Sequence, residues 1–281
     1  MFYLLNILIQ MKILLNNQIL KETLRPFNDI GFVPTMGGIH KGHISLIKES
    51  NKVCKKTVVS IFINPKQFNS KKDLKSYPSN IHKDLATLKK NKDVDYVYVP
   101  KFIDVYKSKK KSKIKIKKKD KILCAKYRKD HFEGVLDVMD KLTDIIMPKK
   151  IFMGKKDFQQ LFLVKNFIEK KYKTKVIGCK TVRDKNMVAL STRNYLLNKN
   201  ELKTAGKLAK QLLLLKKNIK NKKNITSSLL KEKKLLQKNF NIKIQYLEIR
   251  DEKKLQISNK INKSRIFISY YLGNVRLIDN F

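Results

Sequence analysis

Short apolar runs alternate with longer amphipathic stretches over the first two thirds of this chain. The run at residues 58–63, Val-Val-Ser-Ile-Phe-Ile, is continuous and rich in β-branched side chains, which is typical of a strand buried in a parallel sheet. Comparable runs predict strands at residues 12–15, 30–33, 94–99, 150–153 and 175–180. The periodic stretches between them predict helices at residues 18–27, from about 40 to 54, 80–90, 132–147 and 158–172.

The pattern changes after about residue 188. Two helices rich in leucine and lysine, at residues 201–219 and 227–238, precede short strands at residues 242–249 and 264–271. Strand–helix alternation without an internal repeat predicts an α/β fold with a doubly wound parallel sheet for residues 1–187. Residues 188–281 are interpreted as a smaller α+β domain that covers the cleft of the first domain.

Lysine dominates the charge of the chain, because only seven of its 65 basic residues are arginine and its formal net charge is +42. The lysines occur nearly everywhere, including the expected exposed helix faces at residues 207–223. Nucleic-acid recognition favours arginine forks interleaved with aromatic side chains, and no segment has that pattern. We interpret the lysines as drift at tolerant surface positions, with weak, salt-sensitive binding to polyanions as the consequence. The lysine-rich residues 107–121 are interpreted as a charged edge strand or a loop.

The cysteines and the amino terminus together favour a cytoplasmic location. Cys54, Cys124 and Cys179 are odd in number and far apart, without a disulfide framework or metal-ligand spacing, which fits a reducing compartment. The apolar residues 1–10 lack the basic start and cleavage site of a signal peptide, the alternative interpretation, and they are too short to span a membrane. We interpret them as an extension, with Met11 opening the first strand and standing as an alternative start.

The clearest chemical signal is the motif at residues 34–43, Pro-Thr-Met-Gly-Gly-Ile-His-Lys-Gly-His, which follows a predicted strand. A Gly-rich turn that leads into a helix brings backbone N–H groups and a positive dipole end to one point, an arrangement that suits phosphate. His40 and His43 lie on the same side of the helix, and Gly42 leaves room for a nucleotide. A His pair alone is equally compatible with a structural role. Strand, turn and His pair together predict a nucleotide site.

This motif resembles the H-x-G-H element of nucleotidyl-transferring α/β enzymes, and its surroundings resemble one family, the pantothenate synthetases (pantoate–β-alanine ligases). Further family-like segments follow in the family's order over about residues 11–281. They are Asn-Pro-Lys-Gln-Phe at 64–68, Tyr-Pro at 77–78, His-Phe-Glu-Gly-Val at 131–135, Met-Gly-Lys-Lys-Asp-Phe-Gln-Gln-Leu at 153–161, and the segments at 182–194 and 272–280.

The resemblance implies a Rossmann-like fold and a reaction in two steps. The carboxylate of (R)-pantoate attacks the α-phosphorus of ATP to give an acyl adenylate and pyrophosphate, and β-alanine then displaces AMP to form the amide of pantothenate, a coenzyme A precursor. Such chemistry asks a protein for positioning and charge stabilisation rather than a covalent nucleophile. The resemblance also implies Mg²⁺, a homodimer and small-molecule substrates, with no specific nucleic-acid or membrane partner. The sequence contains no evident metal-ligand cluster.

Residue by residue, the resemblance assigns the catalytic role of proton donor to His43, assisted by His40 and Lys156. Gln67 and Gln160 are implied to hold pantoate, with Gln67 also contacting β-alanine and Asn64 assisting. A neutral amide donates to a carboxylate without neutralising it, so the carboxylate remains nucleophilic. The implied ATP contacts are Met36, Gly37, Gly38, Ile39, His40, Lys41, Gly42, His43, Gly154, Lys155, Lys156, Asp157, Val182, Leu190, Ser191, Thr192 and Arg193.

Two positions depart from the family pattern. Lys155 stands where the family commonly has Glu, so only a backbone contact is expected there. Before His131 the family usually has an acidic, Gly-rich segment with Arg, Pro and Gly, whereas this chain keeps only Arg128 and His131. Two other functions remain open: a related nucleotidyltransferase that moves AMP to a phosphorylated acceptor, and a basic nucleic-acid-binding protein that has kept a nucleotide fold.

Overall fold

The computed structural model describes residues 11–106, 113–219 and 225–281, and the predicted extension at residues 1–10 lies outside these ranges. Its first unit is built on a parallel sheet with strand order β1-β4-β3-β2-β5-β6. The strands are β1 (Lys12–Leu14), β2 (Ile30–Thr35), β3 (Lys56–Ile61), β4 (Tyr96–Tyr98), β5 (Lys150–Gly154) and β6 (Lys175–Cys179). The predicted fold class is therefore confirmed.

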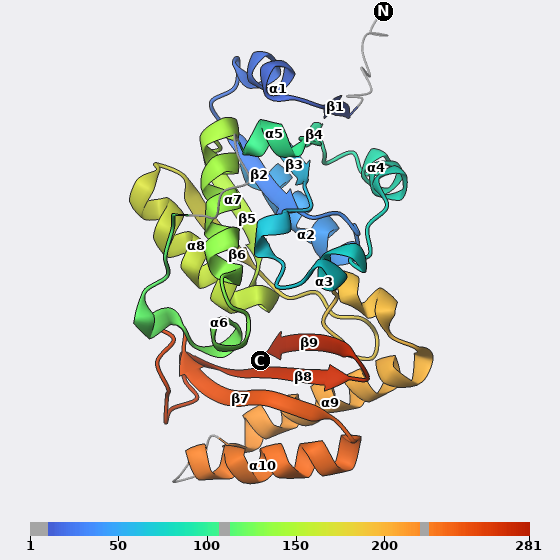
Figure 1. The fold of residues 1–281 in the computed structure, drawn as a ribbon, viewed down its shortest axis with the longest axis vertical. Helices are drawn as coiled ribbons and strands as arrows, with labels where there is room; N and C mark the ends of the chain where they lie inside the picture. The colour runs from blue at the N-terminus through green and yellow to red at the C-terminus, as the bar shows by residue number, and fades with distance from the viewer. Residues whose placement is uncertain (1–10, 107–112, 220–224) are drawn as a thin grey trace, which may run out of the picture.

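Helices cover both faces of this sheet (Figure 1). Because side chains alternate along a strand, Phe32 packs with α1 (Asn17–Leu24), α7 (His131–Ile146) and α8 (Phe158–Lys171) on one face. Its neighbour Val33 packs on the other face with α2 (Lys41–Val53) and α4 (Ile81–Lys89). Asparagine side chains cap several helices, as Asn80 does by accepting a hydrogen bond from the Lys83 amide.

Several short elements were not predicted, because a single turn leaves no periodic pattern to detect. They are α3 (Lys71–Lys75), α5 (Phe102–Val105), α6 (Leu123–Tyr127) and the 3₁₀ turns Pro65–Gln67, Lys118–Asp120, Lys155–Asp157 and Thr192–Leu196. Of the lysine-rich stretch, residues 107–112 lie outside the described ranges. Residues 113–117 form neither helix nor strand, so the edge-strand interpretation is wrong for that part.

The second unit is a three-stranded antiparallel sheet of β7 (Lys243–Asp251), β8 (Ser264–Leu272) and β9 (Val275–Asn280). Helices α9 (Lys199–Asn218) and α10 (Ile225–Phe240) cover one of its faces (Figure 1). On the other face Tyr246 and Phe267 join the core of the first unit, and the Phe267 ring meets Phe158 edge-on at 5.8 Å. Strand β9 was not predicted, because its residues lack a clear alternation of apolar and polar positions.

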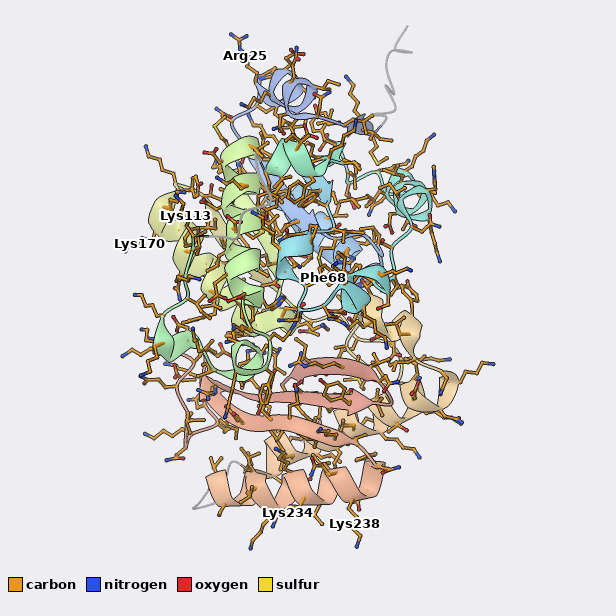
Figure 2. The ribbon with its side chains drawn as sticks, in the orientation of Figure 1. Arg25, Phe68, Lys113, Lys170, Lys234 and Lys238 are labelled. Carbon is orange, nitrogen blue, oxygen red and sulfur yellow. The ribbon has the colours of Figure 1, made fainter. Side chains whose placement is uncertain are left out.

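Several lysine side chains of the second unit are exposed to solvent. Lys234 and Lys238 point away from α10 (Figure 2), and Lys207, Lys210 and Lys217 of α9 are exposed while Leu208 and Leu212 are buried. The exposed lysine face expected for residues 207–223 is thus present as far as residue 219; residues 220–223 lie outside the described ranges. Among the described helices, none has the length and hydrophobicity to cross a bilayer.

Candidate active site

A cavity of about 280 Å³ opens where the carboxyl ends of β2 and β5 lie side by side. The strand order reverses at this point, with β3 and β4 on one side and β6 on the other. In open parallel α/β sheets, ligands bind in the crevice at such a reversal. The cavity is lined by residues 34–36 at the carboxyl end of β2, residues 153–154 of β5, and Arg276 and Asp279 of β9, so both units contribute to it.

Most of the residues assigned from the sequence meet in this cavity. The exceptions are Gly37, Gly38, Ile39, Lys41 and Lys155, whose side chains or backbone do not line it. The residues that do line it are Met36, His40, Gly42, His43, Gln67, Gly154, Lys156, Asp157, Gln160, Val182, Leu190, Ser191, Thr192 and Arg193.

His40 and His43 lie at the start of α2 and contact each other. His40 caps the helix, its Nδ1 accepting a hydrogen bond of 3.0 Å from the Gly42 amide, and His43 Nδ1 accepts one of 3.3 Å from the His40 amide. The two rings stack with centroids 4.1 Å apart. A Cβ on Gly42 would lie 2.7 Å from His40 Cε1, so this position has no room for a side chain.

Burial sets the protonation state of both rings, and their hydrogen bonds determine the tautomer. Burial, followed by the coulombic effect of Lys156, lowers the pKa of His40 to about 4. Burial, then His40 and Lys156, lowers the pKa of His43 to about 3. Both imidazoles are therefore neutral at pH 7, and because each Nδ1 accepts a backbone N–H, the ring proton is on Nε2. Each ring offers one N–H donor, suited to charge that develops on an oxygen.

The Gly-Gly turn before α2 binds a carboxylate of its own chain. The buried Asp84 side chain of α4 accepts hydrogen bonds from the Gly38 amide at 2.9 Å and the Ile39 amide at 2.7 Å. The expectation that this turn offers its backbone N–H groups to phosphate is therefore wrong for these two amides, because they already have a partner. His40, His43 and Lys156 line the cavity and carry side-chain donors.

The turn after β5 is held by the carboxyl end of β9. Asn280 Nδ2 donates to the carbonyl oxygens of Lys155 and Lys156 at 2.9 and 2.8 Å. The neighbouring Asp279 pairs with both terminal nitrogens of Arg183 at 2.7 and 2.8 Å, and Arg183 Nη1 also donates to the Met187 carbonyl oxygen. Strand β9 thus ties the lysine-bearing turn to the segment that carries Val182 and Leu190.

The loop at residues 190–193 packs directly on the Gly-Gly turn. Thr192 Oγ1 donates to the Gly38 carbonyl oxygen at 3.3 Å, and a Cβ on Gly38, whose φ is +63°, would clash with Thr192 Cγ2. Arg193 lines the cavity and lies 3.4 Å from the Asp73 carboxylate. A hydroxyl-bearing loop and a guanidinium therefore join the histidines in lining the cavity, a set of donors that fits phosphate.

Amide side chains also line the cavity. Gln67 Oε1 accepts a hydrogen bond of 3.1 Å from Asn64 Nδ2, and Gln67 Nε2 contacts Met36 Sδ at 2.8 Å. Asn64 Nδ2 also donates to the Gly134 carbonyl oxygen, which anchors the pair to α7. Gln160 lines the cavity, whereas its neighbour Gln159 is buried and hydrogen-bonds the backbone of α6 and the segment before it.

The segment that diverges from the family pattern supplies Arg128 and His131 to the cavity. His131 Nδ1 lies 2.7 Å from the Gln67 carbonyl oxygen and its Nε2 lies 2.8 Å from Arg128 Nη1. Burial, then the neighbouring Arg128, lowers the pKa of His131 well below its usual value, so the neutral ring donates from Nδ1 and accepts at Nε2. Asp130, just before it, has a left-handed φ of 59°.

Sequence reasoning missed Asp84, Asp279 and Asn280. The last two lie in the family-like segment at residues 272–280, which was a usable signal, whereas Asp84 stands in an ordinary amphipathic helix and gave none. Among the described residues, no three His, Cys, Asp or Glu side chains are grouped as in a metal site.

Comparisons with known proteins give a consistent result. The family model for pantoate-beta-alanine ligase matches residues 10–281. A pantothenate synthetase from Flavobacterium psychrophilum is 38% identical, covering 92% of this chain and 95% of its own, and one from Clostridium botulinum is 40% identical, covering 90% of each.

Solved structures agree with these relatives. The pantothenate synthetase from Thermus thermophilus superposes with a TM-score of 0.89 at 27% identity, covering 96% of this chain and 99% of its own. The pantoate-beta-alanine ligase from Francisella tularensis, complexed with beta-gamma ATP and beta-alanine, superposes with a TM-score of 0.82 at 33% identity, covering 96% and 97%.

Proposed function

The chain belongs to the pantoate–β-alanine ligase family and is an ATP-binding enzyme of pantothenate synthesis; we propose that it joins (R)-pantoate to β-alanine through a pantoyl adenylate. In the first step a pantoate carboxylate oxygen bonds to the α-phosphorus of ATP and the bond to pyrophosphate breaks. In the second step the β-alanine nitrogen bonds to the acyl carbon, AMP leaves and the nitrogen releases a proton.

The observation that carries this proposal is the meeting of two donor sets in one cavity. One set comprises the Nε2–H groups of His40 and His43, Lys156, and residues 191–193. The other set comprises Gln67 and Gln160, two neutral amides. The first set suits the phosphates of ATP, and the second suits a carboxylate that must stay nucleophilic.

His43 has the role of stabilising charge on the phosphates as the bond to pyrophosphate breaks. Its low pKa means that a neutral ring acts as hydrogen-bond donor, and full transfer of its proton is not needed for that role. Lys156 adds the fixed positive charge, and Asn280 holds the turn that carries it. Val182 and Leu190 are proposed to meet the adenine through their backbones.

The wider setting of the reaction is part of the same proposal. Mg²⁺ is taken to accompany the phosphates of ATP, and the enzyme to act as a cytoplasmic homodimer. Residues 1–187 are proposed as the ATP- and pantoate-binding domain and residues 188–281 as the smaller domain that covers it. Residues of β9 line the cavity, which supports the proposal that the smaller domain covers the binding site.

The test is pantothenate formation from ATP, (R)-pantoate, β-alanine and Mg²⁺, with each reactant omitted in turn. We expect pyrophosphate release to require ATP and pantoate, and amide formation to require all three substrates. Folded protein that forms no pantothenate would contradict the ligase function. AMP transfer to a phosphorylated acceptor in place of pantoate would favour the related nucleotidyltransferase instead.

A further inference from the structure

Asn280, the last residue of β9, uses its side-chain amide to join two elements. Its Nδ2 donates to the carbonyl oxygens of Lys155 and Lys156 at 2.9 and 2.8 Å. Its Oδ1 accepts a hydrogen bond of 3.0 Å from Arg265 Nη1 on β8. Asn280 is 3% exposed, so leaving one of these bonds unmade would cost free energy. The amide therefore has one favoured orientation, with its NH₂ group toward the turn after β5.

The backbone of Asn280 is restrained as well. Its N–H donates to Asp279 Oδ1 at 2.8 Å, and its carbonyl oxygen accepts a hydrogen bond of 3.2 Å from Arg183 Nη2. Arg265, which orients the amide, lies over the Phe158 ring with its guanidinium carbon 4.8 Å from the ring centroid. Phe158 is the first residue of α8. The amide is thus a fixed reference point for the turn that precedes this helix.

The 3₁₀ turn at Lys155–Asp157 has no capping side chain of its own. Gly154 precedes the turn, and Asp157, which precedes α8, makes no capping hydrogen bond. The hydrogen-bond geometry of such a short turn is poor, so it holds its own shape weakly. Asn280 supplies two hydrogen bonds to it from a position 124 residues beyond Lys156 in the chain. The conformation of the turn therefore depends on the second unit.

Lys156 is the side chain whose direction this turn determines. It lines the cavity together with His40 and His43. Burial and, after it, the positive charge of Lys156 lower the pKa of His40, so the ammonium group acts within the histidine site. A lysine ammonium is a compact charge on a flexible stem. Where that charge lies in the cavity consequently depends on how the backbone at Lys156 is held.

We propose that Asn280 is a positioning residue for the first step, placing the Lys156 ammonium against the phosphates of ATP, and that Arg265 orients the Asn280 amide for this role. The inference rests on the ligase reaction proposed above and adds how the second unit takes part in it. A displacement of about 1 Å in a reacting group can cost roughly a hundredfold in rate. Asn280 acts through Lys156, without touching the reacting atoms.

A double-mutant cycle tests this role, with single-turnover pyrophosphate release from ATP and pantoate as the measurement. We expect Asn280→Ala to slow release on the order of tenfold to a hundredfold. Lys156→Ala should slow it on the order of a hundredfold to a thousandfold. The variant with both changes should release pyrophosphate within about twofold of the rate of Lys156→Ala alone, because the amide then has no ammonium group to position.

Three further variants separate positioning from packing. Asn280→Asp keeps the size of the side chain and an acceptor for Arg265 but removes the NH₂ donors, so it should be at least as slow as Asn280→Ala. Arg265→Met keeps an unbranched side chain and removes the hydrogen bond to Asn280; its smaller loss should also disappear when Lys156 is alanine. Arg250→Gln, at a buried position of β7 outside the cavity, is the matched control, and any loss it causes should multiply that of Lys156→Ala.

Two outcomes would overturn the role of Asn280. A loss that persists in full in the Lys156→Ala background would show that Asn280 acts independently of Lys156. Wild-type release by Asn280→Asp would show that the two donated hydrogen bonds are not needed. If Asn280→Ala does not fold, Arg265→Met carries the same cycle and the same criterion. Wild-type protein that releases no pyrophosphate with ATP and pantoate would instead contradict the ligase reaction, so the two failures are distinguishable.

Discussion

The Asp84 carboxylate accepts a hydrogen bond of 2.9 Å from the Gly38 amide, across the gap between α4 and the turn after β2. Asp84 Oδ1 binds the next amide, of Ile39, so both carboxylate oxygens are used. The turn that precedes the histidines is thereby fixed from outside the cavity. The Gly38 and Ile39 amides are therefore occupied, whereas His40, His43 and Lys156 line the cavity.

Replacing Asp84 by Asn tests this arrangement. An amide has one acceptor oxygen, and its NH₂ group would face a backbone N–H, leaving one buried donor without a partner. We expect a loss of unfolding free energy of about 1–3 kcal/mol and slower adenylate formation, measured by urea unfolding and by pyrophosphate release. Asp144→Asn, an exposed change on α7, is the control. Unchanged stability and rate would show that the turn holds its shape unaided.

Substitutions of His43 and of Gln67 are expected to impair different steps of the reaction. His43→Ala should slow adenylate formation by roughly a hundredfold, about 3 kcal/mol, with a modest change in ATP binding, because the lost hydrogen bond strengthens as charge develops. Gln67→Ala should raise the KM for pantoate and β-alanine and leave ATP affinity near its starting value. Single-turnover pyrophosphate release and amide formation separate the two. Wild-type behaviour of Gln67→Ala toward both acids would mean that the acid pocket is assigned to the wrong residue.

The lowered pKa of His40 predicts that stability rises with pH between about 4 and 6.5. The pKa of His40 falls to about 4 in the folded chain from 6.5, so the unfolded chain takes up protons first as the pH drops. Between pH 7 and 5 this should cost roughly 2 kcal/mol for this one side chain. His40→Asn keeps a capping oxygen for the Gly42 amide and should flatten the pH dependence by that amount.

Urea unfolding of His40→Asn at pH 5 and pH 7 provides the measurement. His82→Asn, an exposed change on α4, serves as the control and should leave the pH dependence as it is in the wild type. An equally steep pH dependence in His40→Asn and the wild type would contradict a neutral His40 in the folded chain.

Replacing Asp130 by glycine should stabilise the folded protein. Its φ of 59° is left-handed, its side chain is exposed and makes no capping hydrogen bond, and glycine adopts this conformation without strain. We expect Asp130→Gly to raise the unfolding free energy by up to about 1 kcal/mol, and Asp130→Ala to lower it. Thermal or urea unfolding of both variants decides the point. If the glycine variant is the less stable one, Asp130 makes a favourable contact that offsets its strain.

The parallel sheet and its long helices were predictable from sequence because apolar periodicity is set by burial on each face. Gln67 and Lys156 were found through contiguous motifs that keep their neighbours. Asp84 and Asn280 were not, since a single polar residue pairs with a backbone far away in the chain and leaves no local pattern. The interpretation of the Gly-Gly turn failed for the same reason: the partner of its amides lies 45 residues or more away.

The exposed lysines of α9 and α10 contribute to a positive charge that affects the rate at which substrates encounter the protein. ATP and pantoate are anions, and a molecule with a net charge of +42 attracts anions over several ångströms before any of them reaches the cavity. At low ionic strength this attraction increases the frequency of productive collisions, and at cellular salt the surrounding counterions largely cancel it. Turnover at low substrate concentration is therefore expected to depend on the ionic strength of the medium.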